Sequence, residues 1–156
     1  MPTGIVFQTV DGDNFDVGHT FVTFEKNNTD GTNVRQTLGF YPKGSNFGSE
    51  GAFENNSGHS ADVRYTMNVT KDQFDKALKK VESDASKEYR LDNLNGTEYN
   101  CTDAAISWMN AAGANFGNST SGLFKNTPGN FGQVLKNIPG ANTNPTSGIS
   151  SKGPCN

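Results

Sequence analysis

Apolar and polar residues alternate with a period of two in Gly18 to Glu25 and in Asp62 to Val69, which predicts β-strands. Two further segments, Gly4 to Val10 and Val34 to Tyr41, are bounded by turn-forming residues and are also expected to be strands. In Gly18 to Glu25, Thr20, Val22 and Phe24 are expected on one face and His19 and Phe21 on the other. The Gly-, Ser- and Asn-rich stretch from Lys43 to Ser60 predicts a long loop with Phe47 and Phe53 as apolar anchors.

Three later segments repeat apolar residues at steps of three and four, which predicts helices. The first follows Thr70-Lys71-Asp72-Gln73, which has the form of a capping box, and runs to about Lys87; its polar face, including Asp84, is expected in solvent. The second begins at Cys101 after Asn100, a good N-cap residue, and ends at Gly113. The third opens at Thr127-Pro128.

Hairpins among the strands, followed by helices, predict an α+β fold in which a small antiparallel sheet packs against the helices. A chain of 156 residues is long enough for one domain with a real core. We expect residues 1–140 to form this single domain. The Gly/Ser/Pro/Asn-rich tail at 141–156 is expected to be poorly ordered unless Cys155 pins it.

The overall charge excludes some classes of partner. The net charge is −3 and the pI is near 5.3, and no Lys/Arg cluster could follow a phosphate backbone, so nucleic acid is not an expected partner. No apolar run is long enough to span a membrane, and the N-terminus lacks the pattern of a classical signal peptide. A soluble protein is therefore expected.

Metal and cofactor sites are not expected either. Two histidines and two scattered cysteines lack the short spacing of zinc ligands. The segment Asp11-Gly12-Asp13-Asn14-Phe15-Asp16 resembles a calcium loop only loosely, because it lacks the spaced glutamate.

Cys101 is the most informative residue for chemistry. At a helix start, the free N–H groups and the positive end of the helix dipole stabilise a thiolate, which predicts a lowered pKa and a nucleophilic cysteine. The alternative is a structural role, either as a small buried residue or in a disulfide with Cys155.

A nucleophilic cysteine needs an imidazole to hold the thiolate and to protonate the leaving group. The chain offers His19, at the start of a predicted strand, and His59, in the predicted loop. Backbone N–H groups near Asn100, at the start of the cysteine helix, would supply part of an oxyanion hole.

The segment Asn-Cys-Thr-Asp-Ala-Ala-Ile-Ser-Trp-Met-Asn-Ala-Ala-Gly at 100–113 resembles the nucleophile helix of NlpC-type papain-like peptidases and amidases. Because Gly18-His19-Thr20-Phe21-Val22 precedes it in the chain, the order is similar to the circularly permuted branch, which includes lecithin retinol acyltransferase-like proteins and bacterial effector or toxin domains. The resemblance implies a permuted papain-like fold with Cys101 as nucleophile and His19 as base. It also implies an orienting residue on the next strand, where Gln36 and Tyr41 are the candidates; a dyad without it, or one helped by His59, is the alternative.

The resemblance further implies a secreted bacterial antibacterial effector that hydrolyses amide bonds in peptidoglycan. Such a protein would leave the producing cell through a specialised secretion system and would be matched by an immunity or inhibitor protein. Two other hypotheses stay open from the sequence. One is a non-enzymatic binding module with a Cys101–Cys155 disulfide, and the other is a thiol acyltransferase that uses the same dyad.

Overall fold

The computed structural model describes residues 3–11, 18–91, 99–117 and 127–153. Its strands are β1 (Thr3–Asp11), β2 (Gly18–Asn27), β3 (Asn33–Pro42), β4 (Ser49–Asn55), β5 (Val63–Val69) and β6 (Glu88–Tyr89). Its helices are α1 (Lys71–Asp84), α2 (Cys101–Ala111) and α3 (Pro128–Lys136). The predicted class, an α+β fold with an antiparallel sheet, is confirmed.

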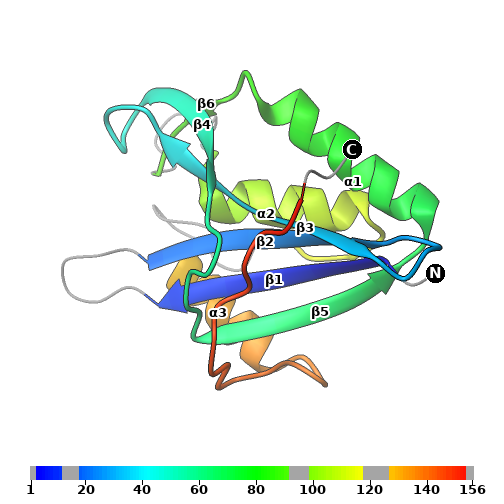
Figure 1. Ribbon diagram of the computed structural model, residues 1–156. Helices are drawn as coiled ribbons and strands as arrows, with labels where there is room; N and C mark the ends of the chain where they lie inside the picture. Colours follow the sequence, from blue (N-terminus) through cyan, green and yellow to red (C-terminus); the bar gives the residue numbers. More distant parts are fainter. Residues whose placement is uncertain (1–2, 12–17, 92–98, 118–126, 154–156) are drawn as a thin grey trace.

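The sheet has the strand order β5-β1-β2-β3-β4-β6, and the pairs within it are antiparallel. In Figure 1 α2 and α3 lie behind the sheet and α1 lies above them, while the C-terminal segment and the connection from β4 to β5 pass in front of the sheet. That connection has to cross the sheet because β4 and β5 lie on opposite sides of β1, β2 and β3. It carries residues 56–62 over the face that the helices leave free.

β4 corrects the prediction of a continuous loop between Lys43 and Ser60. Residues Ser49–Asn55 pair with β3, and Gly51 lies against the ring of Phe40, where a Cβ atom would come within 1.9 Å of the ring carbon Cζ. The glycine that weakens the strand pattern in the sequence is therefore required by packing. Phe53 reaches the core as expected, but Phe47 is 54% exposed and anchors nothing.

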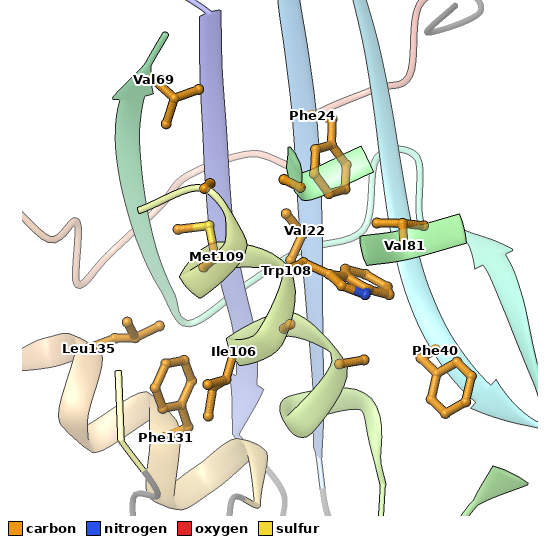
Figure 2. Close-up of a cluster of buried hydrophobic side chains, with 14 of the residues drawn as sticks. Val22, Phe24, Phe40, Val69, Val81, Ile106, Trp108, Met109, Phe131 and Leu135 are labelled. Carbon is orange, nitrogen blue, oxygen red and sulfur yellow. The ribbon is translucent and has the colours of Figure 1, made fainter. Parts of the chain in front are cut away.

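The core lies between the sheet and the helices, with Trp108 of α2 near its centre (Figure 2). The Trp108 ring packs against Phe24 of β2 and Phe53 of β4. Large side chains that are almost fully buried include Trp108, Phe24, Phe40, Phe131, Met109 and Leu135. The expectation that Trp108 and Met109 are core residues is confirmed.

Asp84 departs from its predicted place in solvent, because the last turn of α1 lies against α2 and buries the carboxylate completely. Its oxygens accept hydrogen bonds from Trp108 Nε1 at 2.9 Å, from Lys80 Nζ at 2.6 Å and from the phenol of Tyr99. A carboxylate can be buried where donors replace the lost water, and here they join α1 to α2.

The tail also differs from its prediction. The main chain of Asn142 pairs with that of Arg64 in β5, and the main chain of Lys152 pairs with that of Arg35 in β3. These bonds tie residues 142–152 to the sheet. Cys155 lies outside the described residues. Among the helices that the structure describes, none has both the length and the apolar character needed to cross a membrane.

Candidate functional site

The start of α2 is defined by a reciprocal cap. Asn100 Oδ1 accepts hydrogen bonds from the backbone N–H groups of Thr102 at 2.9 Å and Asp103 at 3.0 Å, and Asp103 Oδ2 accepts from the Asn100 N–H at 2.9 Å. The predicted N-cap is confirmed. It places Cys101 at the first position of the helix, facing the sheet.

The Cys101 side chain is a free thiol in a residue that is only 3% exposed. The sulfur accepts hydrogen bonds from the backbone N–H of Thr20, from Thr102 and from the phenol of Tyr89. A bond of 2.8 Å between the hydroxyls of Thr20 and Thr102 joins β2 to α2 beside it. The thiol is therefore fixed against the first residues of β2.

Burial raises the pKa of the Cys101 thiol above its ordinary value, although hydrogen bonds from Thr20 and Thr102 act in the opposite direction. The sequence predicts a lowered pKa, so that prediction is wrong in direction. Removal from water penalises the thiolate more than the helix start stabilises it, and the carboxylate of Asp103 adds a further unfavourable charge.

His19 lies on the opposite side of β2 from Thr20, as the alternation of the strand predicts. Its ring stacks on Phe21 with centroids 5.6 Å apart and lies 4.3 Å from the ring of Tyr41. The β2–β3 pairing that the structure describes begins at Phe21↔Gly39, so Thr20 lies beyond it and its N–H can reach the Cys101 sulfur. The thiol and the imidazole thus belong to the same end of the sheet.

Asn56, which follows β4, supplies the hydrogen-bond partner of the histidine. Its Oδ1 lies 3.3 Å from His19 Nε2, while its Nδ2 donates to the phenol oxygen of Tyr41 at 2.5 Å. Because the amide oxygen can only accept, this contact assigns the proton of the neutral ring to Nε2 and leaves Nδ1 as the acceptor.

Gly39 gives these side chains their space. A Cβ atom on Gly39 would lie 2.2 Å from Asn56 Oδ1 and 2.4 Å from His19 Nε2. Any side chain at this position would separate the amide from the imidazole. A glycine in the middle of β3 is therefore explained by the His19–Asn56 contact.

Sequence reasoning missed Asn56 because it sought the orienting residue on the strand that follows His19. Of its two candidates, Tyr41 lies at the site, and burial, with a smaller contribution from the charge of Cys101, raises its pKa. Gln36 pairs with Phe24, five residues along β2 from His19 and so about 17 Å away. The segment at 49–55 does not alternate apolar and polar residues, so no pattern in the sequence marks Asn56, the residue that follows it.

His59, the other histidine, lies over the same face of the sheet. Its Nδ1 donates to the carbonyl of Ser60 at 2.9 Å, and its ring is 5.1 Å from Phe21 and 6.4 Å from His19. These contacts cover Phe21. In the part of the chain that the structure describes, no three His, Cys, Asp or Glu side chains gather as the ligands of a metal ion would.

Comparison of the chain with the models of known protein families, with curated proteins and with solved structures gives no match. The class defined by the fold is an antiparallel α+β protein. Its distinguishing local feature is the buried free thiol of Cys101 at the start of α2. It lies next to β2, whose second residue, His19, is hydrogen-bonded to the side-chain amide of Asn56.

Proposed function

We propose that this protein is a cysteine hydrolase of the permuted papain-like class, with Cys101 as nucleophile and His19 as base. The observation that carries the proposal is the hydrogen-bonded series Tyr41–Asn56–His19 at the end of β2 where the thiol binds the Thr20 N–H. A nucleophile, a base and a group that orients the base are the parts that activate a thiol for covalent hydrolysis in a triad.

In the proposed reaction, Nδ1 of His19 takes the thiol proton as the sulfur attacks the carbonyl carbon of an amide. The tetrahedral intermediate breaks its C–N bond, and the proton on Nδ1 passes to the leaving amine. Water then attacks the thioester with Nδ1 accepting its proton. The C–S bond breaks, the acid leaves, and the proton returns to the sulfur.

The environment of Cys101 favours proton transfer during attack over a preformed ion pair. Burial raises the pKa of the thiol, so the protonated form dominates near neutral pH. General base catalysis by His19 then supplies the nucleophile only when substrate is in place. Because Cys101 is 3% exposed, substrate binding has to open a path to the sulfur.

Asn100 is the side chain we propose for the oxyanion hole, together with the backbone N–H of Cys101. Its Nδ2 is buried and has no hydrogen-bond partner among the described residues, while its Oδ1 caps α2. An unsatisfied buried donor costs about 1–3 kcal/mol, which a developing oxyanion would offset.

For the substrate we propose the peptide amide bonds of bacterial peptidoglycan, with the protein acting as an effector against rival cells. The support is the resemblance of 100–113 and of the Gly18-His19 strand to permuted NlpC-type enzymes. The same resemblance supports export by a specialised secretion system and an immunity protein as partner.

Digestion of purified peptidoglycan, followed by mass analysis of the fragments, tests the function. Wild type and the control Cys155→Ala are expected to release peptide fragments with new amine and carboxyl ends, and Cys101→Ala is expected to release none. Fragments from Cys101→Ala, or none from wild type, would contradict the proposal. Loss of release in Cys155→Ala would favour a disulfide-dependent protein instead.

A further inference from the structure

Residues 142–152, here called the C-terminal strap, lie across the sheet on the face that the helices leave free (Figure 1). Backbone pairs fix both ends: Asn142 with Arg64 at the outer edge of β5, and Lys152 with Arg35 of β3. Between them, Arg64 Nη2 donates to the Ser147 carbonyl at 2.6 Å. The strap therefore spans the strands that separate β5 from β3.

Within the strap, Ser151 binds both chain neighbours of Asn56. Its hydroxyl donates to Asn55 Oδ1 at 3.0 Å, and its backbone N–H donates to the hydroxyl of Ser57 at 2.7 Å. Asn56 itself is tied to β3, because its N–H donates to the Thr37 carbonyl at 2.9 Å. The residue that binds His19 is therefore held on both sides by one serine of the strap.

A second contact presses the strap against the same connection. The Gly58 N–H donates to the Ile149 carbonyl at 2.9 Å. Gly148 lies so close that a Cβ atom there would be 2.1 Å from the Gly58 carbonyl oxygen. No side chain fits at Gly148, so the two backbones lie directly against each other. The segment 55–59 therefore has little freedom to shift.

We infer that Ser151 is a positioning residue, which keeps Asn56 in the orientation that holds His19 as its Nε2–H tautomer. Ser151 touches neither His19 nor Cys101 through any described contact and acts through Asn56. The consequence for hydrolysis rests on the proposed function, whereas the consequence for the tautomer of His19 does not. Without the Ser151 hydrogen bonds, Asn56 can turn, and the population of His19 in the Nε2–H form falls.

The test compares Ser151→Ala with Lys152→Ala, a control in the same strap whose side chain bonds only Asn33 Oδ1 among the described groups. Ring ¹⁵N chemical shifts of His19, assigned with the help of His59→Gln, report its tautomer as a function of pH. Wild type and Lys152→Ala are expected to show the Nε2–H form at high pH. Ser151→Ala is expected to show a mixture, and Ser151→Thr, which restores a hydroxyl, is expected to return toward wild type.

Hydrolysis supplies the second readout. Ser151→Ala is expected to lower the rate by roughly tenfold to a hundredfold, the scale of a slightly misplaced catalytic group, and to change its pH profile. Should Ser151→Ala unfold, Ser57→Ala removes the other bond to the strap with a smaller change in packing, and it is expected to shift the tautomer in the same direction.

An unchanged His19 tautomer in a folded Ser151→Ala or Ser57→Ala protein overturns the inference, whatever the activity. A shifted tautomer in a protein that never hydrolyses substrate supports the positioning role and contradicts the proposed function. The two claims are thus separated by the same set of variants.

Discussion

Adjacent residues of β2 have different surroundings on the two sides of the strand. On the helix side, Val22 and Phe24 are fully buried in the apolar core beneath α2. On the other side, His19 bonds an amide, and the buried hydroxyl of Thr23 bonds that of Thr37 at 2.8 Å. One strand therefore contributes to burial on one face and to a directed polar network on the other.

The difference matters because burial and hydrogen bonding constrain a structure in different ways. Removal of apolar area from water stabilises by about 25 cal/mol per Å² and has no directional preference. Hydrogen bonds add only about 1 kcal/mol each but fix the orientation of the groups that they join. We expect changes on the helix side to lower the free energy of unfolding, and changes on the strap side to lower activity first.

Trp108→Ala gives the largest expected effect. It removes a buried indole from the core and one of the three donors to the Asp84 carboxylate, so the free energy of unfolding should fall by about 3–5 kcal/mol in urea denaturation. Trp108→Phe keeps most ring contacts and should lose about 1–3 kcal/mol, chiefly from the lost hydrogen bond to the buried Asp84 carboxylate, which keeps Lys80 and Tyr99 as donors. Equal stability of Trp108→Ala and wild type would contradict the assignment of the core.

Asn100→Ser distinguishes the two roles of Asn100, because serine can still cap α2 but lacks the Nδ2 donor proposed for the oxyanion hole. Serine is an equally good N-cap, so the melting temperature should stay close to that of wild type. Loss of Nδ2 from the oxyanion hole should lower the rate of hydrolysis by about 10²–10³. The control is Asn110→Ser on the same helix, whose side chain bonds the backbone of Phe116 and no other described group. Full activity in Asn100→Ser would remove Asn100 from the mechanism.

Gly39→Ala disrupts the hydrogen bond between His19 and Asn56 directly. The new methyl group overlaps Asn56 Oδ1 and His19 Nε2, so we expect a loss of about 1–3 kcal/mol in stability and a larger loss in hydrolysis. Gly44→Ala is a matched control, since its Cβ atom would lie an ordinary 3.5 Å from Ser49 Cβ. Activity and stability would be measured together, and an active Gly39→Ala protein would show that the His19–Asn56 contact is dispensable.

The smallest expected effect concerns alkaline pH. The pKa of Cys101 is raised in the folded state, so its contribution to stability is complete below the pKa of the unfolded thiol, about 8.5, and is lost as pH rises toward the folded value. Each such group removes at most about 1.4 kcal/mol per pH unit. Urea denaturation between pH 7 and 10 should therefore show a shallower decline for Cys101→Ala, and identical slopes would contradict the raised pKa.

Much of the fold could be predicted from the sequence, because strong local signals agree with the tertiary structure. The capping box at Thr70 is present in α1, and the alternation in β2 places Thr20 and His19 on opposite sides. The strand at 49–55 could not be predicted, since Gly51 weakens its local strand pattern and the reason for that glycine is its close packing against the ring of Phe40 on the neighbouring strand. The burial of Asp84 likewise depends on donors from other elements.

The candidate site could be predicted only in part. Cys101 and His19 stand in motifs of their own, but Asn56 meets His19 because the connection from β4 to β5 crosses the sheet. The direction of the Cys101 pKa shift depends on how deeply the first turn of α2 is buried. That depth is a property of the packing and leaves no local trace in the sequence.

Acylation of Cys101 by a small activated ester, p-nitrophenyl acetate, tests the central claim most directly. Nitrophenol release and intact mass would be followed in wild type, Cys101→Ala and His19→Ala, so the result does not depend on the natural substrate. We expect a stoichiometric burst and an acetyl group on Cys101 in wild type, none at this position in Cys101→Ala, and much slower acylation in His19→Ala. Equally fast acylation of Cys101 in His19→Ala would contradict the claim that this histidine activates the thiol.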